Sequence, residues 1–81
     1  MDAEQLLALL RKSLVMTQNL VAGVAQAHER ELRTAESGLP NQSHVSGALL
    51  NNLGQHLADI RSAIAVVEHV RGLRAETACL N

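Results

Sequence analysis

The sequence predicts an all-α fold, an antiparallel two-helix hairpin that dimerises into a four-helix bundle. Two runs of apolar residues, spaced alternately by three and four positions, predict two long helices. Between them, Ser37-Gly38-Leu39-Pro40 is typical of a helix end followed by a turn. Residues 13–27 are apolar and uncharged, and most of the second half repeats this pattern. Because a lone amphipathic helix keeps a charged face toward water, we expect more than one side of each helix to be covered.

The first helix is expected at about residues 3–37. Asp2 is followed three positions later by Gln5 and then by an apolar run, which is the arrangement of a capping box. The apolar seam of this helix consists of Leu7, Leu10, Leu14, Thr17, Val21, Val24, His28 and, slightly out of step, Leu32. A second apolar row beside it consists of Leu6, Leu9, Met16 and Leu20. The apolar side is therefore wider than a contact with one other helix requires.

The second helix is expected at about residues 43–72, after a turn at about 38–42. Asn41 or Ser43 can cap its start, and Gly72 is a plausible end that leaves 73–81 as a tail expected to fray. Its seam consists of Leu50, Leu53, Leu57, Ile60, Ile64 and Val67. Short connections join antiparallel neighbours, so the predicted register places Val24 near Leu57.

The 81 residues are expected to form one domain, residues 1–81. A domain this short needs a further source of stability, such as a disulfide, a structural metal or oligomerisation. The single cysteine, Cys79, cannot form a disulfide within the chain. A homodimer is the simplest source of this stability, because closed twofold dimers are the commonest homo-oligomers. We expect the intrachain core to consist of Leu7, Leu14, Val21, Val24, Leu53, Leu57, Ile60, Ile64 and Val67. We expect the interface with a dimer mate or another protein to consist of Leu6, Leu9, Leu10, Met16, Leu20, Leu49, Ala63, Val66 and Val70.

Composition argues against several classes of partner. The net charge is −1, which lacks the basic footprint of a nucleic-acid binder, and the chain has no aromatic residue on which a base could stack. Residues 13–27 are too short and too polar to span a bilayer, and Arg11 and Lys12 alone do not make the basic face of an interfacial helix. The N-terminus lacks the features of a secretory signal, so we expect a cytoplasmic protein.

No motif predicts catalysis, a cofactor or a metal site, and we expect a non-enzymatic protein. His28 and His56 fall on or beside the two seams, at levels that bring them within a few residues of each other across the hairpin. A metal site inside a bundle needs several inward carboxylates or imidazoles, and no Asp or Glu is expected inside. Core histidines are the preferred interpretation, and an imidazole in a dimer seam would make assembly sensitive to acid.

Two antiparallel helices around Gly38-Leu39-Pro40, without a catalytic site, resemble the small bacterial antiactivators of the TraM and QseM kind, which shut down quorum-sensing regulators of conjugative transfer. The resemblance covers the whole chain as an architecture and carries over no functional residue. It implies transcription regulation by stoichiometric binding: the aliphatic face would bind a transcriptional activator and block its dimerisation or its DNA binding.

Two other roles fit the same pattern. Type III secretion uses helical hairpins of this size as needle-type subunits and as co-chaperones for them. Needle subunits normally include aromatic residues, so the co-chaperone is the better fit to this chain. A structural oligomerisation module needs nothing beyond the two seams.

Overall fold

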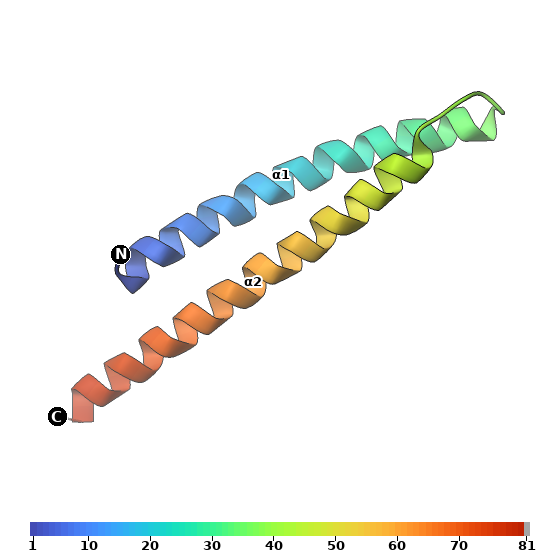
Figure 1. Ribbon diagram of the computed structural model, residues 1–81. Helices are drawn as coiled ribbons and strands as arrows, with labels where there is room; N and C mark the ends of the chain where they lie inside the picture. The colour runs from blue at the N-terminus through green and yellow to red at the C-terminus, as the bar shows by residue number, and fades with distance from the viewer. Residues whose placement is uncertain (81) are drawn as a thin grey trace.

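The computed structural model describes the backbone of residues 1–80 and the side chains of residues 1–75. It consists of α1 (Ala3–Glu36) and α2 (Ser43–Leu80), which run antiparallel, and residues 1–80 contain no strand (Figure 1). The predicted helical hairpin is therefore confirmed. The helices form a rod of 69 × 15 × 14 Å. They lie close together near the connection and separate toward the chain termini in the view of Figure 1.

Both ends of α1 are capped as the sequence predicts. The Asp2 carboxylate accepts a hydrogen bond from the Gln5 backbone N–H at 2.8 Å, and the Asp2 backbone N–H donates to Gln5 Oε1 at 3.1 Å, which completes a capping box. At the other end Gly38 has a φ of 75°, a left-handed conformation that glycine adopts without strain. The backbone N–H of Leu39 then donates to the Thr34 carbonyl at 3.2 Å, as in a Schellman motif.

The connection runs back along the end of α1 before α2 begins. The backbone N–H of Gln42 donates to Glu31 Oε2 at 2.6 Å, which fixes the start of α2 beside the last turns of α1. Asn41 Oδ1 accepts from the backbone N–H of Ser43 at 3.0 Å and from its hydroxyl at 2.6 Å. Asn41 thus satisfies a donor of the first turn that the helix itself cannot satisfy.

The predicted end of α2 at Gly72 is wrong, and residues 73–80 are helical rather than a tail. Gly38 is the only glycine with a positive φ, so Gly72 does not adopt the left-handed conformation that ends many helices. A glycine inside a helix costs only about 1 kcal/mol relative to alanine. Leu73, Arg74, Ala75 and Glu76 follow it, and all four residue types favour helix.

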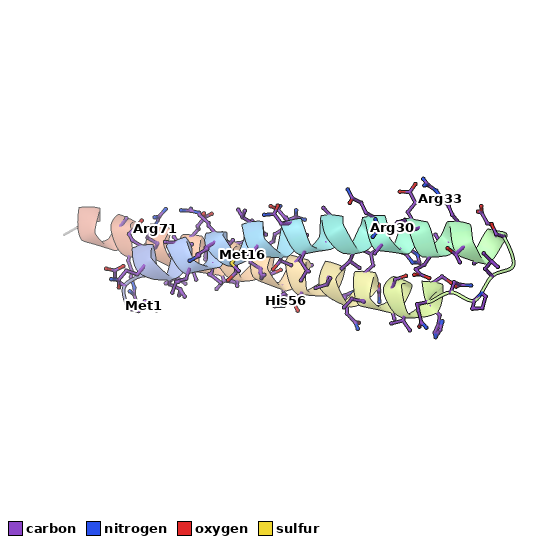
Figure 2. All side chains as sticks on the ribbon, turned by 90° about the horizontal axis from the view of Figure 1, so that it is seen from above. Met1, Met16, Arg30, Arg33, His56 and Arg71 are labelled. Atoms are coloured by element: carbon purple, nitrogen blue, oxygen red, sulfur yellow. The ribbon has the colours of Figure 1, made fainter. Side chains whose placement is uncertain are left out.

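The contact between the helices buries few side chains completely. Among the described side chains Leu7, Ile60 and Thr17 are buried, with exposed fractions of 0%, 6% and 8%. All three belong to the predicted seams. Figure 2 shows the Arg33 side chain directed away from α2. The core of one hairpin is therefore narrow, a single row of contacts along the rod.

The predicted register of the two helices is wrong by more than one helical turn at the loop end. It would place His28 opposite Asn52, whereas the His28 ring lies against Gly47. The difference arises in the connection. The prediction placed residues 38–42 at the tip of the hairpin, but these residues return beside α1, and Gln42 already lies next to Glu31.

Candidate functional site: an apolar face formed by both helices

One edge of the hairpin is polar and carries two ion pairs between the helices. Arg11 Nη2 lies 2.8 Å from Glu68 Oε1, and Arg71 pairs with Glu4. Glu4 and Arg11 are seven residues apart, so they lie on the same side of α1. Each pair is about half exposed and contributes between about 0 and 1 kcal/mol to stability. The main consequence of these ion pairs is that the edge carries charged groups that are stable when they are exposed to water.

The opposite edge is apolar on both helices. Leu6 and Leu20 on α1 and Val66 and Val70 on α2 are all exposed. Leu6, Val66 and Val70 line one common pocket, so these residues of α1 and α2 lie near one another at the open end of the hairpin. Leu20 lies on the same side of α1 as Leu6, because the two residues are fourteen positions apart. The name apolar face is used below for the set Leu6, Leu9, Met16, Leu20, Leu49, Val66 and Val70, all of them exposed.

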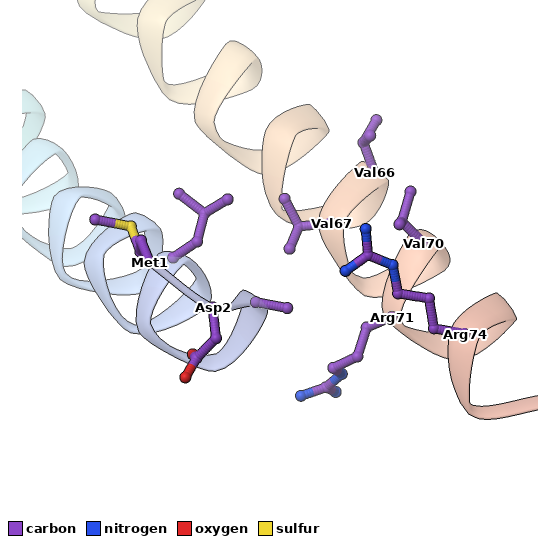
Figure 3. A pocket seen from close by; sticks show the side chains of 9 residues that line it. Met1, Asp2, Val66, Val67, Val70, Arg71 and Arg74 are labelled. Carbon is purple, nitrogen blue, oxygen red and sulfur yellow. The ribbon is translucent and has the colours of Figure 1, made fainter. Parts of the chain in front are cut away.

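The pocket lies at the open end of the hairpin, where the two helices have separated (Figure 3). Its volume is about 260 Å³. The lining residues are Met1, Asp2, Ala3, Leu6, Val66, Val67, Val70, Arg71 and Arg74. The floor is aliphatic and the rim carries charge from Asp2 and the two arginines.

His28 lies in the seam near the loop. Its Nδ1 and Ser46 Oγ share a hydrogen bond of 2.7 Å, and its ring covers Gly47, where an added Cβ would lie 3.1 Å from Cε1. His56 is exposed, nine residues along α2 from Gly47. The expectation that the two histidines come close to each other is therefore wrong. Among the residues that the structure describes, no group of three or more His, Cys, Asp or Glu is placed to hold a metal ion.

The two predicted residue sets occupy different environments. In the expected core set, Leu7 and Ile60 are buried and the others are half-buried. In the expected interface set, Leu10 and Ala63 are half-buried and the others are exposed. Sequence reasoning missed Val45 and Leu73, which are also exposed. Val45 precedes Val66 by 21 residues and Leu73 follows it by seven, so both lie on the same side of α2 as Val66. That seven-residue spacing is the signal that could have identified them.

The chain exposes more surface than a monomer of its size normally does. A monomeric protein of 8.7 kDa is expected to expose about 4,700 Å². This hairpin exposes 5954 Å², an excess of about 1,200 Å² over that expectation. The elongated shape of 69 × 15 × 14 Å contributes to this excess, which is of the size that one partner contributes to a large protein–protein interface.

Over the part of the chain that the structure describes, neither helix contains a stretch both long and apolar enough to cross a membrane. Comparisons of the chain with protein families, with curated proteins and with solved structures find no match.

Proposed function

We propose that this chain is a non-enzymatic protein-binding module of the cytoplasm, and that its apolar face packs against the helices of another hairpin. The first such partner is a second copy of the chain, which completes a four-helix bundle. The observation that carries the proposal is the excess exposed area of about 1,200 Å², together with the aliphatic residues gathered on one face.

The area suits a stable dimer. Covering about 1,200 Å² on each of two copies buries about 2,400 Å² in total, which falls in the range of obligate homodimers. Aliphatic side chains supply the driving force, because burying apolar surface gains about 25 cal/mol per Å² before the costs of association. The polar edge, with its ion pairs Arg11–Glu68 and Glu4–Arg71, stays in water.

The regulatory form of this proposal follows from the resemblance to antiactivators. In that form the face also captures helices of a transcriptional activator and prevents the activator from pairing with itself. Its test is a two-hybrid array of transcriptional regulators from the source genome. We expect the parent chain to bind one regulator and the Met16→Asp variant to lose that binding.

The self-association is tested by sedimentation equilibrium on three variants. Leu9→Asp and Met16→Asp place a carboxylate on the apolar face, where burying it without a partner is costly, so we expect both variants to sediment as monomers. Val15→Asp is the matched control, because Val15 is 55% exposed but lies on the other side of α1. We expect it to remain a dimer. Equal masses for all three variants would contradict the proposal.

A further inference from the structure

We propose that the second copy docks as a twofold-symmetric partner whose rod runs in the opposite direction, an orientation called head to tail here. In it α1 packs against the other copy's α1, and α2 packs against the other copy's α2. This inference rests on the proposed function and adds the orientation and the residues that meet. In this arrangement the twofold axis crosses the rod near its middle and the two connections lie at opposite ends. The alternative places both connections at the same end and packs α1 against the other copy's α2.

The middle of the hairpin is fixed by two contacts. His28 lies against Gly47 near the loop, and Glu4 pairs with Arg71 near the open end. On α1, the position midway between residues 4 and 28 is residue 16. On α2, the position midway between residues 47 and 71 is residue 59. By these two contacts residues 16 and 59 lie at one level, and a twofold axis through that level reverses both helices about it. The long side chains of Arg11 and Glu68 pair although Glu68 lies four positions beyond the level of Arg11 in this register.

Large side chains on α1 meet small ones under this operation. The face of α1 follows two series of seven-residue steps, Asp2, Leu9, Met16, Gly23 and Arg30 in one, and Leu6, Ser13, Leu20 and Ala27 in the other. Reversal about residue 16 brings Leu9 to the other copy's Gly23 and Met16 to its own counterpart at the axis. It brings Leu6 and Leu20 to positions 26 and 12, next to the small residues Ala27 and Ser13 of the face. Facing positions that alternate large and small side chains let two helices interdigitate closely.

The charges on α1 agree with the same orientation. Reversal about Met16 brings Asp2 of one copy to Arg30 of the other, a pair of opposite charges at each end of the contact. The side chain of Arg30 forms none of the ion pairs found within the described residues. In the same-end alternative, Arg30 would instead lie against Val45.

The face of α2 has its own symmetry about nearly the same level. Two series with seven-residue steps lie on this face, Leu49, His56, Ala63 and Val70 in one, and Val45, Asn52, Asp59, Val66 and Leu73 in the other. Reversal about residue 59 brings Val45 to Leu73 and brings Leu49 to position 69, next to Val70, so aliphatic residues meet at both ends. Asp59 meets its own counterpart at the axis.

The unequal lengths of the helices also favour the head-to-tail orientation. Arg71 is level with Glu4, so residues beyond about 72 extend past the start of α1, as Figure 1 shows. A head-to-tail dimer lays this extension beside the connection and the first residues of the other copy's α2. In the same-end alternative, both extensions project together beyond the two α1 helices and stay uncovered.

The orientation is tested by a distance between spin labels. In a Cys79→Ser background, Ser37→Cys places one label at the connection of each copy. Ser37 lies 21 residues from Met16, so the head-to-tail dimer separates the labels by about 60 Å at 1.5 Å per residue. The same-end dimer brings them within about 30 Å, because neighbouring helices lie 8–10 Å apart. A double electron–electron resonance distance near 60 Å is the expected result.

Disulfide formation between mixed variants gives a second measurement. In the Cys79→Ser background, a mixture of Leu6→Cys and Ala27→Cys chains is expected to form a cross-linked heterodimer, and a mixture of Leu6→Cys and Val70→Cys chains is not. A dimer with a short label distance and the opposite cross-linking overturns the orientation and leaves self-association intact. A chain that sediments as a monomer at every concentration overturns the self-association and this inference together.

Discussion

Leu20→Ala tests the strength of the dimer contact quantitatively. Full burial of a leucine side chain contributes about 1.5–3 kcal/mol. Leu20 is 54% exposed in the hairpin, so roughly half of that, about 1 kcal/mol, is gained only on dimerisation. Each dimer contains two copies of the residue, and the substitution therefore costs about 2 kcal/mol of association. The dimer dissociation constant is expected to rise about 30-fold.

Leu32→Ala is the matched control, because Leu32 is 45% exposed but lies outside the apolar face. We expect it to change the dissociation constant less than about threefold, as surface substitutions usually do. Sedimentation equilibrium over a range of loading concentrations measures both constants, and circular dichroism verifies that both variants remain helical. If both substitutions weaken the dimer equally, or neither does, the assignment of the apolar face is wrong.

Three further predictions concern the hairpin core, a tight contact and a charge. Ile60→Asp buries a carboxylate in the seam and is expected to cost about 4 kcal/mol or more, enough to abolish the helical circular dichroism signal at 25 °C; a helical variant would show that the seam is not the core. Gly54→Ala has open space around its new methyl group and is expected to stabilise α2 by about 0.5–1 kcal/mol in thermal unfolding, whereas Gly47→Ala presses on His28 and is expected to gain less or lose stability. Asp59→Asn removes a like-charge approach at the twofold axis, so the dimer should tighten about two- to fivefold in low salt and less in high salt; no salt dependence of this gain would speak against the head-to-tail contact.

The helices themselves could be predicted from the sequence because their signals are local. The reciprocal bonds of Asp2 and Gln5, and the left-handed Gly38 before Pro40, depend only on residues within a few positions of one another. The seam is equally local in origin, since a repeat of three and four residues brings Leu7 and Thr17 to one side of α1.

The register and the end of α2 depend on features that local patterns do not contain. The register is fixed by the path of the connection, where the Glu31 carboxylate accepts the Gln42 N–H, a contact between residues eleven positions apart. The end of α2 was predicted at Gly72 because glycine often ends a helix. Whether the helix continues past a glycine depends on the helix propensity of the residues that follow it. To place the apolar flanks of α1 and α2 on one side also requires the antiparallel pairing to be known, and the contacts Glu4–Arg71 and His28–Gly47 supply it.

The distribution of charge around the hairpin bears on how far assembly proceeds. An open filament, as a needle-type subunit forms, requires two different surfaces on each subunit that fit each other without closing. In this hairpin the edge opposite the apolar face carries the pairs Arg11–Glu68 and Glu4–Arg71, and docking a further helix there would remove charged groups from water. When two copies pair through the apolar face, that face is covered on both copies and no further copy can bind to it. We therefore expect the mass measured by light scattering to rise with concentration to twice 8.7 kDa and to stop there. Continued growth beyond the dimer would show that the polar edge also binds, and would favour a filament subunit over a closed pair.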